Sequence, residues 1–465
     1  MKTKRLLSLV FGLLLAFHAS PLSPVLADDT PPRPYYIVQP GDTLSSIAYR
    51  FGIDIHDLAA ANNITHLSDL QAGQKLELPG LEGFQGEMTV RAAAFGDNLT
   101  AFSRAYHIPR DNLARLNHVV TPYQIFAGKG VILPKDALQH PQPQRVLVKN
   151  ASLTDTALAH GSSPWALALA NQLPGTWAAL PGDVLMLPGT VDKSDTPLGL
   201  PSGVSVALEP QQWPQGRTGE VKVTADAIQA VEGGFGERPL HFFPFENQTW
   251  VALQGVFALA EPGLRPLRLQ ITLDEQGTFA FEQAIEVIRG NYTSERLNVP
   301  ANLLDPALNE AETQKFSELT REATPTRYWQ GVFRPPEAPP LDDCHPSYFG
   351  TRRNYNDSFF WYHTGLDFCG RVGTPIYAPA DGMVIFTGVT EIHGNVTIID
   401  HGWGVYTTYC HQSEILVKEG QRVHTGDLIG KVGRTGRVTG PHLHWEVWVG
   451  NVPVDPLEWL QRAFP

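Results

Sequence analysis

Two short segments near the C-terminus carry the residue types that bind metal ions. His363 and Asp367 are four positions apart, and His442 and His444 are two apart. In an extended chain both spacings place the two side chains on one face, so each pair can reach a single ion. Gly365 and the β-rich surroundings favour extended chain over helix. Three of these four side chains suffice for a zinc site with one open coordination position, which is the arrangement of a catalytic site.

The chemistry of such a site follows from its charge. A zinc ion held by two neutral imidazoles and one carboxylate stays positive, polarises a carbonyl and lowers the pKa of water toward neutrality. A histidine nearby that does not bind the metal can take or return a proton at physiological pH. We expect His411 to be this base, and His442 to assist it or to stabilise the oxyanion. Glu446 is either a partner that orients a histidine or a surface strand residue.

A series of motifs surrounds these residues in a fixed order. They are Phe349-Gly-Thr-Arg-Arg, Gly373-Thr-Pro-Ile, Gly382-x-Val384, Gly394-Asn-Val-Thr-Ile-Ile-Asp-His-Gly, Tyr409-Cys-His411, Gly433-x-x-Gly436 and Gly440-Pro-His442-Leu-His444-Trp-Glu. Together they resemble the lysostaphin-type (LytM-like) zinc metallopeptidases, over roughly residues 345–460. The resemblance implies a compact antiparallel β-structure with an open groove that cuts peptide bridges of bacterial peptidoglycan.

Carried over position by position, the resemblance implies one Zn²⁺ bound by His363, Asp367 and His444. His411 and His442 then flank the metal as catalytic residues. The sequence departs from the family at Cys410, where glycine is usual, and at Gln412, where an apolar residue is common. We interpret Cys410 as a small buried residue of a strand.

The other histidines of this region receive structural interpretations. His401 lies in an Asp-His-Gly turn, which we expect it to stabilise through hydrogen bonds. His393 and His424 are interpreted as loop or surface residues without a metal role.

The first half of the chain contains three copies of an internal repeat. Asn62, Asn117 and Asn171 each stand 17 positions before a proline, which gives periods of 55 and 54 residues. The first copy reads as a strand, a helix capped by Thr43, a second helix and a closing strand. It resembles a LysM module, a βααβ fold that binds N-acetylglucosamine-containing glycans such as peptidoglycan. The second and third copies depart from the motif and are either glycan-binding modules or degenerate spacers.

The middle of the chain alternates in the manner of short β-strands. The runs are Val204–Leu208, Glu220–Val223, Trp250–Leu253, Leu267–Ile271 and Ala284–Ile288. Gly233-Gly234 and Pro262-Gly263 are interpreted as turns between them, which predicts an immunoglobulin-like β-sandwich. A helix is expected from Leu303 to Ala323, with Leu303, Leu304, Leu308, Phe316 and Leu319 on its apolar face.

Composition indicates an exported protein. Residues 1–27 have a basic start, a short apolar core and small residues before Asp28, which predicts a signal peptide. The net charge of −12, about −15 without that segment, argues against a nucleic-acid partner. No later stretch predicts a membrane span. The three cysteines leave at least one thiol unpaired, and we hypothesise a Cys344–Cys369 bridge.

The sequence therefore predicts a multidomain, mainly β protein. The expected parts are a signal peptide (1–27), LysM repeat 1 (34–80), LysM-like repeat 2 (88–135), degenerate LysM-like repeat 3 (144–189), a β-sandwich (200–300), a helical linker (301–335) and a zinc metallopeptidase domain (345–465). The expected function is a secreted or periplasmic, cell-wall-associated zinc endopeptidase of peptidoglycan. A non-enzymatic regulator of other wall hydrolases is the alternative.

Overall fold

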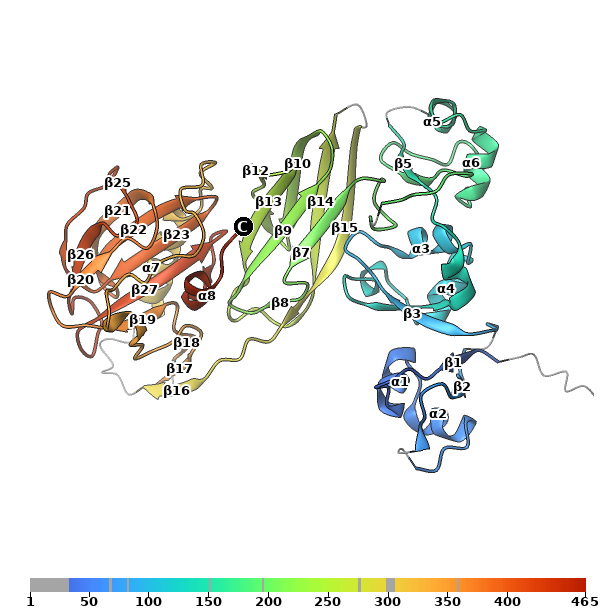
Figure 1. Ribbon diagram of the computed structural model, residues 1–465. Coiled ribbons are helices and arrows are strands. Elements are labelled where there is room, and N and C mark those ends of the chain that lie inside the picture. Colours follow the sequence, from blue (N-terminus) through green and yellow to red (C-terminus); the bar gives the residue numbers. More distant parts are fainter. Residues whose placement is uncertain are drawn as a thin grey trace, which may run out of the picture.

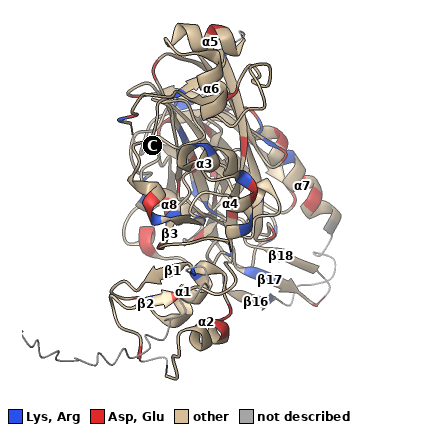
Figure 2. Ribbon diagram, turned by 90° about the vertical axis from the view of Figure 1, so that its right-hand side faces the viewer, with Lys and Arg blue, Asp and Glu red and all other residues tan. Residues whose placement is uncertain are grey.

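The computed structural model describes residues 33–66, 69–81, 83–149, 152–194, 196–274, 277–297, 306–357 and 359–465. Three small helical modules, a β-sandwich and a β-rich C-terminal domain follow one another, with the sandwich between the other two parts (Figure 1). Lys and Arg residues alternate with Asp and Glu residues along the ribbon on the side of the modules (Figure 2). In the described part of the chain, no helix has the length and hydropathy of a membrane span. The expected signal peptide lies outside the described residues.

Each sequence repeat folds as two strands that enclose two helices. Repeat 1 comprises β1 (Tyr35–Ile37), α1 (Leu44–Phe51), α2 (Ile55–Ala61) and β2 (Lys75–Glu77). Repeat 2 comprises β3 (Met88–Ala92), α3 (Leu99–Tyr106), α4 (Arg110–Leu116) and β4 (Gly130–Pro134), with 3-10 helices at Pro122–Gln124 and Lys135–Gln139. Repeat 3 comprises β5 (Arg145–Leu147), α5 (Leu153–Ala159), α6 (Pro164–Ala170) and β6 (Val184–Met186). In each repeat the two strands pair antiparallel.

The repeated asparagine holds the second helix of each module against its closing strand. In repeat 2, Nδ2 of Asn117 donates to the carbonyls of Leu113 and Ile132, and Oδ1 accepts the N–H of Ile132. Asn62 and Asn171 make the corresponding three bonds in their own repeats. One side chain thus satisfies a helix C-terminus and a strand at once, which explains its fixed place in the repeat.

The Asn117→Ala variant is expected to destabilise repeat 2. It removes the side-chain hydrogen bonds to both backbone groups of Ile132 and to the Leu113 carbonyl, which keeps the backbone N–H of residue 117 as a partner; each buried group left unpaired costs about 1–3 kcal/mol. Faster hydrogen exchange at the Ile132 amide would report this loss, since a multidomain chain does not unfold in one transition. The control is Asn112→Ala, because in the described part of the chain the Asn112 side chain bonds only the Arg115 side chain. Equal exchange in both variants would contradict the role of Asn117.

The repeats pack on one another and on the sandwich. Met88, Leu116 and Ile132 of repeat 2 belong to the hydrophobic cluster of repeat 1. The Arg104 guanidinium of repeat 2 donates to the carbonyls of Asn171 and Val184 in repeat 3, each at 3.1 Å. Apolar side chains of both later repeats enter the sandwich cluster; they are Phe95, Ala127 and Leu147. The modules are therefore packed against neighbouring parts of the protein and are not connected by flexible linkers alone.

The sandwich has a five-stranded and a four-stranded sheet. The first has the order β11 (Arg238–Leu240), β10 (Ile228–Phe235), β14 (Gly263–Leu273), β15 (Gly277–Ile288) and β8 (Trp213–Pro214). The second has the order β12 (Phe243–Phe245), β13 (Thr249–Gly255), β9 (Thr218–Thr224) and β7 (Ser205–Glu209). All five predicted runs coincide with strands, except that Val204 directly precedes β7. The interpretation of Gly233-Gly234 as a turn was wrong: both lie inside β10, where a Cβ on Gly233 would come within 2.8 Å of the Arg268 carbonyl.

The C-terminal domain is built on two antiparallel sheets. The larger has the order β19 (Leu366–Cys369), β27 (His442–Val449), β23 (Val405–Cys410), β22 (Gly394–Gly402), β21 (Gly382–Thr390) and β25 (Arg422–Val423), with β28 (Pro453–Val454) paired to β27. The smaller has the order β20 (Pro375–Tyr377), β26 (Leu428–Val432) and β24 (Gln412–Ile415). A separate sheet joins β16 (Ser294–Leu297), from the end of the sandwich segment, to β17 (Arg352–Tyr355) and β18 (Phe359–Tyr362). Helix α8 (Pro456–Gln461) follows β28, and a 3-10 helix spans Leu341–Asp343.

One hydrophobic cluster runs through the boundary between the sandwich and the C-terminal domain. Val251 and Leu253 of β13 are members of the C-terminal core. Phe243 of β12 stacks on Trp403 with ring centroids 5.3 Å apart. At the same boundary Glu458 of α8 accepts the backbone N–H of Thr218 at 2.7 Å. The sandwich thus covers one face of the C-terminal domain.

The segment predicted as a helical linker packs into the C-terminal domain. Helix α7 (Pro306–Leu319) inserts Phe316, which is buried in a cluster with Val396, Tyr406 and Trp448. Leu303 and Leu304 of the expected apolar face lie outside the described residues. After α7 the chain places Trp329 and Phe333 in the main core. The segment therefore contributes to the C-terminal domain rather than only leading into it.

Glu337, at the end of this segment, gives an expected pH dependence of stability. It is 2% exposed, and neither carboxyl oxygen has a hydrogen-bond partner in the described structure. Burial raises the pKa of Glu337 from 4.5 to about 8. At a pH between 4.5 and about 8, Glu337 is protonated in the folded protein but ionised in the unfolded chain. The free energy of unfolding therefore falls as the pH rises through this range. Glu337→Gln should weaken this fall, measured as thermal midpoints at pH 5 and pH 8; an unchanged difference would contradict it.

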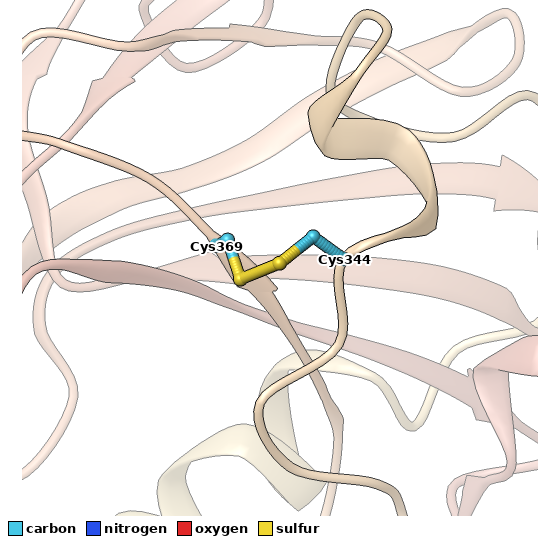
Figure 3. The surroundings of a disulfide bond; sticks show 2 residues. All are labelled: Cys344 and Cys369. Carbon is cyan, nitrogen blue, oxygen red and sulfur yellow. A yellow bond between two sulfur atoms is a disulfide. The ribbon is translucent and has the colours of Figure 1, made fainter.

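The structure confirms the hypothesised Cys344–Cys369 disulfide, which ties the segment before β17 to strand β19 (Figure 3). A backbone hydrogen bond also joins these two segments: the Cys369 N–H donates to the Cys344 carbonyl at 2.9 Å. Cys410 is a free, buried thiol at the end of β23, as expected for a small strand residue.

Candidate metal and active site

Three predicted metal-binding residues converge on one point of the larger sheet. Asp367 on β19 and His444 on β27 are direct cross-strand partners. Nδ1 of His444 lies 2.9 Å from Oδ1 of Asp367 and 2.9 Å from Nε2 of His363, and that nitrogen lies 3.0 Å from the same carboxylate oxygen. All three residues are buried. The described residues therefore include a His–Asp–His group able to hold a metal ion.

The reason that His363 reaches Asp367 differs from the expectation. The two residues do not share a continuous strand, because β18 ends at Tyr362 and β19 begins at Leu366. The chain bends between these two strands, and the bend places the His363 side chain beside Asp367 of β19. It requires Gly365, where a Cβ would lie 2.5 Å from the Trp445 carbonyl and 2.8 Å from the His444 ring. The predicted extended spacing was thus wrong in detail, although the two side chains meet.

Neighbouring groups fix the orientation of both histidines. Nδ1 of His363 lies 3.0 Å from the Tyr348 carbonyl and 3.2 Å from the Ser347 hydroxyl. Nε2 of His444 lies 3.1 Å from Glu446, whose other oxygen accepts the Trp448 indole N–H at 2.8 Å. Glu446 is buried, which decides between its two interpretations in favour of the orienting partner.

The electrostatics favour a cation at this group. Burial alone would raise the pKa of Asp367, but the charge and hydrogen bonds of His363 and His444 hold it well below its ordinary value. Burial alone would lower the pKa of His444, but hydrogen bonds with Asp367 and Glu446 raise it to about 9. Two buried carboxylates thus favour positive charge on or beside His444, whether a proton or a metal ion supplies it.

His411 and His442, the predicted catalytic pair, stand beside the metal-binding group. Their ring centroids are 4.9 Å apart, and the His411 ring lies 5.8 Å from that of His444. His411 joins β23 to β24 with a φ of +58°, a left-handed backbone rare outside glycine. Its Nδ1 lies 2.9 Å from the Thr435 carbonyl, and its backbone N–H donates to the His393 carbonyl at 2.8 Å. Such backbone strain is found where surrounding structure imposes a side-chain direction.

Burial lowers the pKa of His411 well below its ordinary value, and the nearby His444, His442 and His393 act in the same direction. The imidazole is therefore neutral at physiological pH, with Nδ1 engaged by a backbone carbonyl. A neutral imidazole whose Nδ1–H is bonded offers the lone pair of Nε2, which is the form that accepts a proton.

Sequence reasoning missed two residues of the site. His393, interpreted as a loop or surface residue, does lie in a turn but is largely buried and lines the same pocket as the metal-binding group. Its Nδ1 lies 2.6 Å from Glu312 of α7, which had no assigned role. No motif links these two residues, which are 81 positions apart in the chain. His401 is also buried and bonds the Asp381 carbonyl and Thr407, whereas His424 is exposed as expected.

The pocket has a volume of about 790 Å³ and draws its walls from several segments. Helix α7 contributes Thr313 and Phe316, the loop before β27 contributes Arg437, and the sandwich contributes Phe257. The same pocket is lined by five histidines, which are His363, His393, His411, His442 and His444. A buried His–Asp–His group beside further histidines, on an antiparallel sheet and open to a pocket, is the arrangement of a metallohydrolase site.

Comparison with known families agrees with this class. Residues 361–456 match the model of Peptidase family M23, and residues 36–79 and 94–134 match the LysM domain. The chain therefore contains an M23 peptidase domain and two LysM domains. This confirms the resemblance inferred from the motifs of the C-terminal domain and of the first repeat.

Three known proteins illustrate the similarity. Peptidoglycan DD-endopeptidase ShyA of Vibrio cholerae is 48% identical over 96 residues, which is 21% of this chain and 22% of ShyA. DD-carboxypeptidase/endopeptidase Mpg of Neisseria meningitidis is 46% identical over 95 residues, 20% of this chain and 22% of Mpg. The catalytic domain of lysostaphin from Staphylococcus simulans is 26% identical with a TM-score of 0.21, covering 29% of this chain and 92% of that domain. The chain thus spans about a fifth of the length of the curated relatives it matches.

Proposed function

We propose that this protein is a zinc endopeptidase that hydrolyses peptide cross-links of peptidoglycan and is held at the cell wall by its LysM modules. The bond we propose is a DD cross-link, on the strength of the similarity to proteins named as DD-endopeptidases. Such an enzyme acts outside the cytoplasmic membrane, in agreement with the signal peptide predicted from the sequence.

The observation that carries the proposal is the convergence of His363, Asp367 and His444. Their three donor atoms lie 2.9–3.0 Å from one another, close to the separation of about 3.3 Å that follows from tetrahedral bonds of about 2.0–2.1 Å. Two imidazole nitrogens and a carboxylate oxygen are a donor set that zinc accepts, and Glu446 orients one imidazole from behind. The residues present therefore fit a zinc ion.

When bound, zinc supplies a Lewis acid that polarises the scissile carbonyl and activates water. The side chains around it supply the remaining functions. His411, neutral and strained toward the site, takes a proton from the attacking water and returns it to the leaving amine. His442, whose Nδ1 lies 3.0 Å from the Gly440 carbonyl, assists at the oxygen that becomes negative. The pocket walls hold the peptide and limit access of bulk water.

The LysM modules supply the second half of the proposed function. We propose that repeats 1 and 2 bind glycan strands, which keeps the enzyme near an insoluble substrate and raises the effective concentration of cleavable bridges. Repeat 3 shares the βααβ order and the buried asparagine, and its binding of glycan stays a prediction.

The test is digestion of purified sacculi with the mature protein, with and without a zinc chelator, followed by mass spectrometry of the muropeptides. Loss of cross-linked dimers that the chelator prevents is the expected result, and the new ends identify the bond. Sacculi that bind the protein but keep their dimers would contradict the enzymatic proposal and favour a regulator of other hydrolases.

A further inference from the structure

We propose that Arg238 of the sandwich is a substrate-binding residue that recognises a free carboxylate of the bound peptide. Arg238 begins β11 and lines the same pocket as the metal-binding group. The inference rests on the proposed function and deepens it, because it assigns recognition of the peptide to a domain outside the region that matches the peptidase family. The sandwich is then a part of the substrate site rather than a spacer.

The pocket is a groove that follows one face of β27 from the metal-binding group to the sandwich. Alternate side chains of β27 line it, and these are His442, His444, Glu446 and Trp448. The side chains between them point into the core of the C-terminal domain. At about 3.4 Å per residue, β27 extends about 17 Å from His444 to its end at Val449, which is the length of about five residues of an extended peptide.

The position of Arg238 at the sandwich end of this groove is fixed from both sides. The tip of the β10–β11 hairpin is bonded to β14, because the Gly236 N–H donates to the Pro266 carbonyl at 2.8 Å and the Gly236 carbonyl accepts from Arg268 at 3.1 Å. On the other side, Arg238 lies against the turn after β27, where the Asn451 side chain is bonded to α7. The guanidinium is thus held in place before a substrate arrives, which lowers the ordering cost of binding.

Arg238 differs in its partners from Arg353, another arginine of the pocket wall. Arg353 donates to Glu295 at 2.7 Å, whereas Arg238 has one long hydrogen bond of 3.5 Å to the Asn451 carbonyl. Among the residues that the structure describes, no acidic group lies within ion-pair distance of Arg238. Partial burial lowers the pKa of Arg238, and no neighbouring carboxylate opposes this shift. A guanidinium has five N–H groups and keeps its charge, so most of its donors are available to a ligand.

A carboxylate is the ligand that fits this donor set. A planar fork of N–H groups matches the two oxygens of a carboxylate, and the free carboxyl groups of a peptide are ionised at neutral pH. The acidic residues of the pocket wall, Glu295, Asp367 and Glu446, each have an arginine or histidine partner of their own. The chain as a whole carries a charge of −12, so attraction for an anionic peptide must come from a local contact.

A purely structural role for Arg238, as a bond across the domain boundary, explains less. A hydrogen bond of 3.5 Å is weak. The boundary is already held by Val251 and Leu253, which pack in the C-terminal core, and by the hydrogen bond from Thr218 to Glu458. Neither contact needs a positive charge at the rim of the pocket, and a contact with an anionic ligand does.

Arg238→Ala tests the contact with cross-linked peptide dimers that carry no sugars, so that the LysM modules do not contribute to binding. We expect KM to rise about 10-fold with kcat within about 2-fold, as for loss of one contact made equally in ground and transition states. Amidation of the carboxyl groups of the dimers should raise KM of the unaltered protein by a similar factor and leave that of Arg238→Ala nearly unchanged. Arg238→Lys, which keeps the charge but not the fork, should recover part of the loss.

Arg265→Ala is the matched control, since it removes the same charge from β14 of the same domain at a residue outside the pocket wall. Its KM should equal that of the unaltered protein. An unchanged KM in Arg238→Ala, equal KM rises in the two variants, or an equal response of Arg238→Ala and the unaltered protein to amidation would each overturn the proposal.

Failure of the proposed function is distinguishable from failure of this inference. If the unaltered protein cleaves no dimers, the same dimers can be titrated into the full-length protein by calorimetry. Arg238→Ala should then bind them about 10-fold more weakly than the unaltered protein and than Arg265→Ala. Equal affinities in the three proteins, or no binding to any of them, would overturn the role of Arg238.

Discussion

His444→Ala is expected to abolish chelator-sensitive hydrolysis of muropeptide dimers while the protein still binds sacculi. His444 supplies one of three clustered donor atoms, and it also carries the hydrogen bond to Glu446 that orients the group. Loss of a partner behind a metal ligand lowers metal affinity or activity about 10–100-fold, so loss of the ligand itself should exceed about 100-fold. Bound zinc per protein and dimer cleavage are the two measurements.

Glu446→Gln is the graded companion of this variant. It keeps the shape of the side chain but weakens its hydrogen bonds, among them the one with His444 beside those with Thr364 and Trp448, so a loss of about 10–100-fold is expected. Binding to sacculi should be unchanged in both variants, because the modules lie far along the chain from the substituted residues. Hydrolysis by His444→Ala at the rate of the unaltered protein would refute the metal assignment.

Trp329→Ala is expected to destabilise the C-terminal domain by about 3–5 kcal/mol, the range for removing a buried large side chain. Trp329 is 1% exposed, and its ring meets those of Trp403 and Trp459 at 5.9 and 5.8 Å. Its indole N–H donates to the Phe464 carbonyl at 2.6 Å, so the variant also leaves that carbonyl without this partner. The residue therefore joins the segment after α7, the sheet and the C-terminal helix.

The expected result is a lower unfolding temperature of the C-terminal domain, followed through loss of bound zinc on heating. Trp177→Ala in repeat 3 is the control, because Trp177 is 75% exposed and its removal should change stability by no more than about 0.5 kcal/mol. A fragment that begins at residue 345 lacks Trp329 altogether and is expected to fold poorly. Equal effects of the two tryptophan substitutions would contradict the placement of Trp329 in the core.

Periodic features of the fold were predictable from the sequence, and tertiary ones were not. The repeat spacing identified three modules because each must satisfy the same helix end with an asparagine such as Asn117. Alternation located five sandwich strands. It failed at Gly233-Gly234, where glycine serves close contact between strands rather than a turn. The role of Trp329 was not predictable either, since nothing local distinguishes a linker tryptophan from one that fills a distant core.

The candidate site shows the same division. The ordered motifs pointed to His363, Asp367 and His444, and the structure brings those three side chains together; their metal binding stays a proposal. His393 was assigned no role because its significance depends on Glu312, which the fold brings to it from a separate helix. A pairing across 81 positions has no periodic or local signature, and only the packing of α7 creates it.

The continuous packing from the repeats through the sandwich to the C-terminal domain has a mechanical consequence. Shared hydrophobic clusters cross the boundary between the repeats and the sandwich and that between the sandwich and the C-terminal domain, so the modules that match LysM and the domain that matches the peptidase family are held at a fixed separation. A flexible tether sweeps a volume, whereas a rod reaches only the points one rod length away. An enzyme with the proposed function and this rigidity would cleave peptide bridges at one set distance from the glycan that it holds. It would spare bridges at other distances from that glycan.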